Sequence, residues 1–195
     1  MRHSLPTRLL HLLLATAILA QLATSQLMRT PRPGRVRTPL ESAGFAVHEW
    51  VGLAAMAILL AFWLWLTLRR LGTVPGQLFP WFSRTRLLEL RQDALRYLQA
   101  ARRLSLPEPE QGEAVAAALH GLGLLIALAM ATTGTLGWLS WDQAAGMDGF
   151  ARAVFEVHGT LANLMWAYVI AHVGAAILHE LLGHRLLRRM SPFTP

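Results

Sequence analysis

Cysteine and lysine are both missing from this chain of 195 residues. Without cysteine there are no disulfide bonds, iron–sulfur clusters, thiolate zinc sites or covalently attached c-type haem. Without lysine, all 18 basic residues are arginine, and they exceed the 11 acidic residues to give a formal charge of +7. Because 54% of the residues are hydrophobic, we interpret this charge as a signal of membrane orientation and expect no nucleic-acid partner.

A polar face is missing from the four longest apolar stretches, residues 9–28, 45–68, 115–139 and 157–178. Each has about 20 to 25 residues, enough to cross roughly 30 Å of hydrocarbon as a helix. A water-soluble bundle needs a polar outer face, which these stretches do not have. Their leucine and alanine content favours helix. We predict an all-α integral membrane four-helix bundle that forms a single membrane domain over residues 1–195.

The arginines lie mostly on one side of this bundle. With four spans, the two termini and the loop 69–114 share a side and hold 13 of the 18 arginines. The positive-inside rule therefore predicts that both termini and this loop are cytoplasmic. The alternative is that the first 28 residues form a signal peptide, with Arg2 and Arg8 before an apolar run and Ala23-Thr24-Ser25 as the cleavage site. The nearly full span length of that run argues against cleavage.

The loop 69–114 is too long for a plain connector. Its residues 86–104 place apolar side chains at helical spacing, with the arginines largely on other faces. These apolar residues are Leu87, Leu90, Ala94, Leu98 and Ala101. We predict a short helix along the cytoplasmic interface in contact with membrane lipid; the alternative is a solvated helix without lipid contact.

Six of the eight histidines lie within or near the ends of the apolar stretches. The other two, His3 and His184, receive no functional role. Histidine inside a bilayer is costly, so its presence there indicates function. We therefore compare the six histidines by their expected depth in the membrane.

Four of these histidines match in pairs. His11 and His172 share the inner depth, and His48 and His158 share the outer depth. His158 and His172 are fourteen residues apart, about 21 Å along a helix, and project from nearly the same face. The sequence therefore predicts two stacked sites, each made of two imidazoles on different helices.

Haem fits such sites best. No cysteine or carboxylate is placed to complete a tetrahedral zinc shell, whereas a porphyrin supplies four nitrogens and needs only two axial donors. An iron filled by two histidines passes electrons and has no open position for a substrate. Small residues near the ligands would leave room for a flat ring or simply allow close helix packing. They are Gly52, Gly159, Gly174 and Ala175.

Four segments carry a family resemblance that covers nearly the whole chain. They are PTRLLH at 6–11, VHEWVGLAAM at 47–56, the H-x13-H pattern of the fourth span, and AHVGAAILHELLGHRLLRRM at 171–190. The chain resembles the bacterial b-type cytochromes of the cytochrome b561 and Ni,Fe-hydrogenase cytochrome b superfamily. Its middle loop is longer than in the shortest members.

The resemblance implies a four-helix bundle in the bacterial inner membrane that holds two b haems. It implies His11 and His172 as axial ligands of the inner haem iron, and His48 and His158 as those of the outer haem iron. It also implies electron exchange with the quinone pool, with ubiquinone or menaquinone as substrate. The other partner would be a dehydrogenase, a soluble cytochrome or superoxide.

Two further histidines compete for roles near the inner site. His120, at a depth comparable to His11, could be a rival ligand, a hydrogen-bond donor to a haem propionate, or a residue that simply faces the interface. His179 lies seven residues beyond His172 on the same face, where it could exchange a proton with a quinone or act as a polar cap. HELLGH at 179–184 places histidines five residues apart, which predicts diverging rings and argues against a zinc protease.

Two other functions account for part of the pattern. One is a histidine-lined metal or proton transporter. A transporter of this kind would be expected to have a carboxylate midway through the membrane, but Glu49 and Glu156 lie near the outer boundary, which weakens the transporter hypothesis. The other is a membrane anchor subunit of a larger enzyme, which leaves the buried histidines unexplained. We therefore predict a dihaem b-type cytochrome linking a redox partner to the quinone pool, either a quinone-reactive oxidoreductase or a subunit of one.

Overall fold

The computed structural model describes residues 4–29, 35–68, 75–103, 105, 107, 113–142 and 146–193; His3 lies outside them. All the elements in this described part are helical. They are α1 (Leu5–Leu27), α2 (Pro39–Leu68), α3 (Pro75–Leu78), the 3-10 turn η1 (Pro80–Phe82), α4 (Arg84–Arg102), α5 (Glu113–Ser140), α6 (Gly149–Leu181) and α7 (Leu186–Met190). Four of them, α1, α2, α5 and α6, are long and apolar enough to cross a membrane. The prediction of an all-α, multi-pass membrane protein is confirmed.

The long helices extend beyond the apolar stretches of the sequence. Helix α6 has 33 residues and α2 has 30, or about 50 Å and 45 Å of helix against roughly 30 Å of hydrocarbon. The additional turns begin at residues that cap a helix. Thr38 and Glu41 exchange side-chain bonds to each other's backbone N–H, at 3.2 and 3.0 Å, directly around Pro39. Asp148 accepts from the Ala151 N–H at 2.7 Å where α6 begins.

The chain divides into two compact units, each built from separate stretches of sequence. Unit 1 comprises Met1–Arg8, Leu64–Leu125 and Tyr168–Pro195. Unit 2 comprises Leu9–Trp63 and Ile126–Ala167. Each of the four long helices contributes residues to both units.

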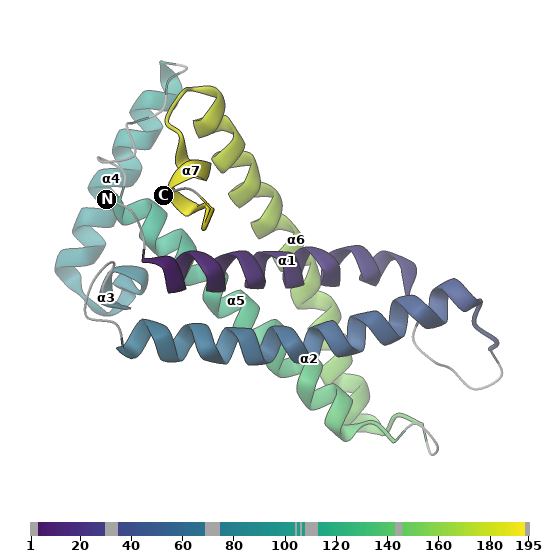
Figure 1. Cartoon of the computed structure of the whole chain (residues 1–195). Coiled ribbons are helices and arrows are strands. Elements are labelled where there is room, and N and C mark those ends of the chain that lie inside the picture. Colours follow the sequence, from purple (N-terminus) through teal and green to yellow (C-terminus); the bar gives the residue numbers. More distant parts are fainter. Residues whose placement is uncertain are drawn as a thin grey trace. The chain divides into compact units, whose positions relative to one another are not determined.

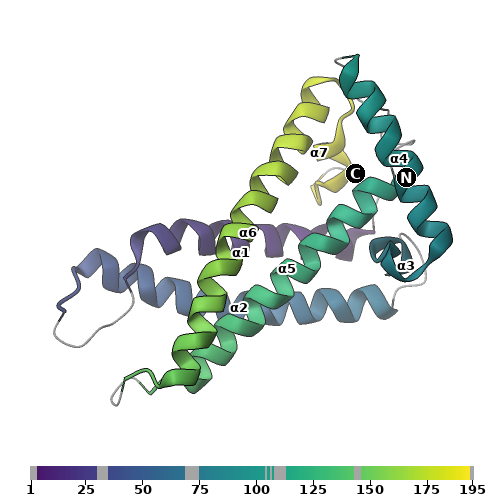
Figure 2. The same ribbon diagram turned by 180° about the vertical axis from the view of Figure 1, so that it is seen from behind.

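In unit 2, two helical hairpins are recognisable. Helices α1 and α2 lie side by side and run antiparallel (Figure 1), and Gln21 on α1 donates to the His48 carbonyl on α2 at 2.7 Å. Helices α5 and α6 leave their connection side by side (Figure 2). Between the hairpins, Trp141 contacts Phe45 and Phe155 edge to face, with ring centroids 5.7 and 6.1 Å apart. Aromatic contacts of this kind fix how the hairpins pack within the unit.

In unit 1, a carboxylate from α4 caps the beginning of α5. Asp93 is only 3% exposed, and its Oδ2 accepts from the Val115 N–H at 3.0 Å. The first N–H groups of a helix lack partners within the helix and favour a negative charge, so this contact fixes α5 against α4. Burial, followed by the charge of Asp93, raises the pKa of nearby Tyr97.

The apolar stripe predicted for the loop helix is not its buried face. Helix α4 buries Asp93, whereas Leu87 and Leu98 are 41% and 51% exposed. Ser83 caps the beginning of α4, and its hydroxyl accepts from the Arg86 N–H at 3.5 Å. An exposed stripe of leucines suits a lipid interface, which stays a prediction.

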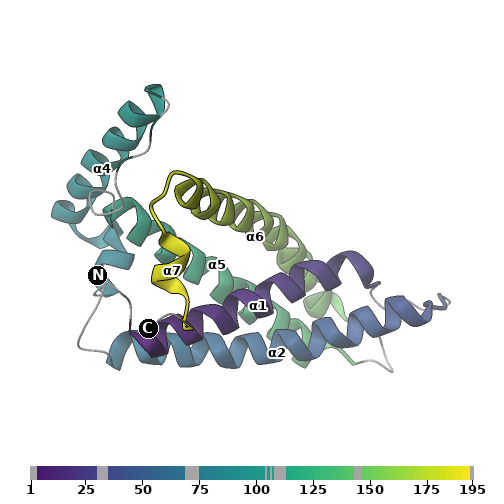
Figure 3. The same cartoon turned by 45° about the horizontal axis from the view of Figure 1, so that its top comes forward.

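The C-terminal segment of unit 1 folds back after α6. Figure 3 shows α7 returning from the end of α6 toward the first turn of α1. There the Arg8 guanidinium donates to the Ser191 carbonyl at 2.7 Å. In the same unit the Trp65 indole donates to the Thr7 hydroxyl at 2.9 Å. These contacts tie the first turn of α1 to both α2 and the C-terminal segment.

Candidate functional site

Two imidazoles from different helices face each other in unit 2. His48 comes from α2 and His158 from α6, and both are half-buried. Their ring centroids are 6.4 Å apart and the ring planes are at 90°. The structure thus brings together the two histidines that the sequence pairs at the outer depth.

A threonine on α1 is hydrogen-bonded to Nδ1 of His48. The Thr24 hydroxyl lies 3.1 Å from His48 Nδ1 and donates to the Ala20 carbonyl at 2.8 Å. A hydroxyl has a single proton, which the carbonyl takes, so toward the imidazole it can only accept. His48 Nδ1 therefore carries a proton, which leaves Nε2 with a free lone pair.

His158 is held in the same way from α5. Its Nδ1 lies 3.0 Å from the Thr133 hydroxyl and 3.1 Å from the Met130 carbonyl. Thr133 donates its proton to the Ala129 carbonyl at 2.8 Å, and a carbonyl can only accept. Nδ1 of His158 is therefore protonated as well, and its Nε2 has the free lone pair.

The separation of the two rings fits a metal ion between the Nε2 atoms. Two metal–nitrogen bonds of about 2 Å and two ring radii of about 1.15 Å, from ring bonds near 1.35 Å, place the centroids about 6.3 Å apart. The observed value is 6.4 Å. A nitrogen ligand whose other N–H is hydrogen-bonded is typical of metal-binding histidine. Haem requires two axial donors, which the two imidazoles can supply. The carboxylate of Glu49, next to His48 in the chain, accepts from the Trp138 indole.

One glycine on α5 gives the His158 ring its space. A Cβ at Gly134 would lie 3.0 Å from His158 Cε1. The glycines singled out from the sequence have other surroundings: a Cβ on Gly52 would meet the Gln21 side chain at 3.5 Å, and no described atom lies within 4 Å of one on Gly159 or Gly174. Gly134 follows Thr133 directly on α5. Its contact with His158 becomes visible only once α5 and α6 are packed together.

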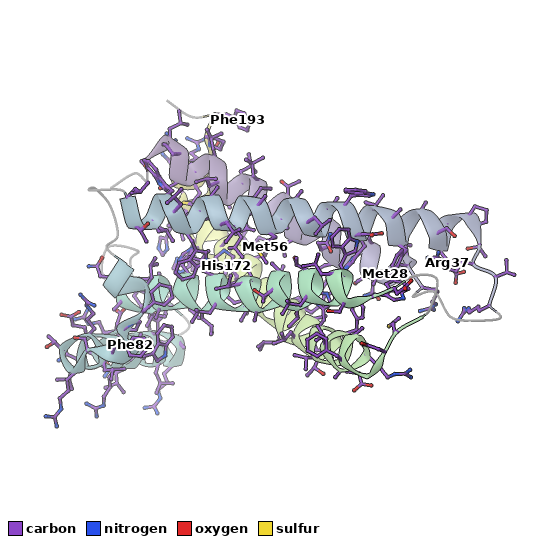
Figure 4. The ribbon with its side chains drawn as sticks, turned by 90° about the horizontal axis from the view of Figure 1, so that it is seen from below. Met28, Arg37, Met56, Phe82, His172 and Phe193 are labelled. Carbon is purple, nitrogen blue, oxygen red and sulfur yellow. The ribbon has the colours of Figure 1, made fainter. Side chains whose placement is uncertain are left out.

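The histidines of unit 1 pack differently. His172 on α6, beside α5 in Figure 4, has its ring centroid 5.2 Å from that of His120. Tyr168 stacks on His172 at 5.5 Å with an angle of 14°. His120 Nδ1 lies 2.6 Å from the Ala116 carbonyl of its own helix. At 5.2 Å the rings touch edge to face, about 1 Å closer than two imidazoles on opposite sides of one metal ion would be.

Comparison with known proteins decides the family. The family model for prokaryotic cytochrome b561 matches residues 2–193. The chain belongs to the prokaryotic cytochrome b561 family. It is therefore a b-type cytochrome of membrane electron transfer, and the family implies b-type haem binding. Searches of curated proteins and of solved structures give no match.

The remaining ligand candidate of the cytochrome is His11. It lies on α1, half-buried, in the part of that helix that belongs to unit 2. His172 belongs to unit 1. The inner pair of His11 and His172 stays a prediction.

At the end of α6 the cytochrome has another imidazole pair. His179 is 7% exposed, and its Nδ1 lies 2.8 Å from Nδ1 of His184. The prediction that these rings diverge is wrong. Helix α6 ends at Leu181, and Gly183, with φ of +83°, turns the chain so that His184 returns onto the helix. Two nitrogens at this distance share one proton.

Proposed function

We propose that this cytochrome holds two b haems and transfers electrons between a redox partner and the quinone pool. When bound between two imidazoles, haem iron supplies a one-electron carrier without an open coordination position. The observation that carries the proposal is the pair His48 and His158, with both Nε2 lone pairs free and ring centroids 6.4 Å apart.

In this proposal His48 and His158 hold the outer haem through Nε2. Their Nδ1–H groups remain bonded to threonine, which keeps each ring from turning. With an imidazole on each side, the two histidines would leave no open position for dioxygen or a small substrate, and the haem would supply one-electron transfer.

The inner haem is assigned to His11 and His172. Their shared depth in the sequence supports this pair, and so does the geometry around His172. Because the His120 ring is in direct contact with that of His172 at 5.2 Å, His120 is placed to contact a ligand and not to be its opposite axial partner. Tyr168, stacked on His172, orients the ring.

The quinone site is assigned to the end of α6 and would take ubiquinone or menaquinone. Reduction of a quinone takes two electrons and two protons, so a site needs a group that supplies protons. The buried His179, with a proton shared with His184, can pass a proton inward and regain one from the more exposed imidazole. Arg185 and Arg188 follow directly and suit anionic headgroups at a cytoplasmic surface in the bacterial inner membrane.

The other redox partner is a dehydrogenase, a soluble cytochrome or superoxide. A b-type cytochrome with filled axial positions takes electrons singly from any of these. Whether the chain acts as an oxidoreductase by itself or as a subunit depends on which of them reduces it.

One measurement tests the proposal as a whole. The purified full-length protein, in lipid nanodiscs, is assayed for its reduced-minus-oxidised visible spectrum and its haem content per chain. We expect two haems, both reduced anaerobically by a short-chain ubiquinol or menaquinol. A folded protein without haem would overturn the proposal, and two haems that no quinol reduces would remove the quinone pool from it.

A further inference from the structure

The two hairpins of unit 2 present the same hydrogen-bond arrangement to the two outer histidines. In each hairpin a threonine on the first helix faces a histidine on the second. Thr24 faces His48 across 24 residues of chain, and Thr133 faces His158 across 25. The arrangement thus occurs twice, once for each proposed axial ligand.

The local geometry of the two threonines is also the same. Each hydroxyl lies 2.8 Å from the carbonyl four residues earlier and 3.1 Å from the one three residues earlier. These acceptors are Ala20 and Gln21 for Thr24, and Ala129 and Met130 for Thr133. Threonine bonds back to its own helix in this manner in many helices. Here the bond also commits the only hydroxyl proton, so the oxygen is a fixed acceptor for imidazole.

We infer that Thr24 and Thr133 are positioning residues that fix the tautomer and ring plane of the two outer haem ligands and set the redox potential of that haem. The inference rests on the proposed haem between His48 and His158. Neither threonine touches the iron; each acts through the histidine it bonds.

The effect on potential has a definite sign. A hydrogen bond from Nδ1–H to an acceptor raises the basicity of the imidazole and so strengthens its donation through Nε2. Stronger donation stabilises the ferric state more than the ferrous state, and this lowers the potential. Removal of the acceptor should therefore raise it.

Replacing Thr24 and replacing Thr133 should change the redox potential by different amounts. His158 Nδ1 has a second acceptor in the Met130 carbonyl at 3.1 Å, which remains when Thr133 is replaced. In the described part of the chain, the Nδ1 acceptor of His48 is Thr24. Thr24→Val should therefore shift the potential more than Thr133→Val.

The chain supplies a matched control on the same helix as His158. Thr160 also donates to the carbonyl four residues earlier, that of Glu156, at 3.0 Å, but its side chain is exposed. Thr160→Val removes the same kind of local bond without removing an acceptor for histidine. It separates loss of helix back-bonding from loss of ligand positioning.

The test compares Thr24→Val, Thr133→Val, Thr24→Ser and Thr160→Val in the haem-loaded full chain. Potentiometric titration gives the potential of each haem, and low-temperature EPR reports the relative orientation of the axial rings. For Thr24→Val we expect a positive shift of one haem, up to tenfold in its oxidation equilibrium or about 59 mV, with altered EPR. Thr133→Val should shift the same haem less, and Thr24→Ser and Thr160→Val should match the wild type.

Each result decides the inference. Loss of one haem in Thr24→Val alone, with Thr24→Ser intact, supports it, because without the acceptor the His48 ring is no longer held with its Nε2 lone pair toward the site. Loss in Thr24→Ser as well would show that methyl packing matters and not the hydroxyl, which overturns it. Two haems with unchanged potentials and EPR in both valine variants also overturn it while leaving the proposed function standing. A wild type without haem fails the proposed function instead.

Discussion

The histidine pairs of the two units differ in ring separation and in the hydrogen bonds that hold the rings. In unit 2 the rings of His48 and His158 are 6.4 Å apart, and each Nδ1 is held by a threonine from a neighbouring helix. In unit 1 the rings of His120 and His172 are 5.2 Å apart and in direct contact. Both distances are ordinary for aromatic pairs. The hydrogen bonds therefore carry more information than the distances.

The bonds of the two pairs differ in which helix supplies the partner of the imidazole. A bond from another helix fixes a ring relative to the bundle, as Thr24 and Thr133 do. The bond from His120 goes to Ala116, one turn earlier on the same helix. Support of the first kind suits an imidazole that binds haem together with a histidine on another helix.

The strongest test of this comparison removes one imidazole at a time. His158→Ala should abolish the outer haem and leave about half of the haem absorbance, because one axial nitrogen alone holds b haem poorly. His120→Ala should keep both haems. Haem content per chain and the difference spectrum give the answer. Loss of a haem in His120→Ala would make His120 a ligand and reverse the comparison.

A smaller effect is expected from crowding the outer pair. Gly134→Ala places a methyl group 3.0 Å from His158 Cε1, which should move the ring and cost about 1–3 kcal/mol of overpacking. We expect a several-fold lower affinity for the outer haem. Gly159→Ala, whose Cβ meets no described atom within 4 Å, is the control and should stay within about 0.5 kcal/mol. Equal haem retention in both variants would contradict the packing around His158.

A similar substitution in unit 1 should crowd Tyr168, which contacts the proposed ligand His172, and not the ligand itself. A Cβ at Gly123 would lie 2.1 Å from the Tyr168 hydroxyl and 2.2 Å from its Cζ. Gly123→Ala should displace Tyr168 from its stack on His172 and cost about 1–3 kcal/mol of stability, with both haems retained at saturating haem. Gly174→Ala, with open space around its Cβ, should unfold like the wild type. Thermal unfolding of the loaded protein distinguishes the two.

The smallest effect is expected for the stacked ring itself. Tyr168→Leu keeps an apolar side chain but removes the aromatic stack on His172 at 5.5 Å, worth about 0.5–1.5 kcal/mol. Both haems should remain, with a small change confined to the potential of one haem. A change in the haem that His158→Ala removes would mean that the pairs are not the independent sites proposed.

Much of the fold follows from the sequence because it depends on hydrophobicity over long windows. The four spans appear as long apolar stretches of the sequence. The beginning of α2 at Pro39 lies before the stretch 45–68, because hydrophobicity does not mark the polar first turns of a helix. His48 and His158 could be paired because depth along a helix is proportional to residue number.

Other features could not be found in this way because they depend on how helices turn toward each other. The spans are apolar on every face, so nothing in the sequence shows which side of α5 carries Gly134 or why Thr133 differs from Thr132. Asp93 lies about 100° around α4 from the centre of its leucine stripe. It is buried where it accepts from the first turn of α5. His184 returns to His179 because the helix stops, whereas spacing rules assume that it continues.

The threonine bonds have a further consequence for assembly. Thr24 and Thr133 have already settled the protonation of both outer imidazoles within the packed helices. In the proposed site, an arriving haem would meet imidazoles that need no proton transfer to water and little ring rotation. The same rigidity would keep the reorganisation energy of electron transfer small, so one pair of hydroxyl groups would serve both loading and turnover.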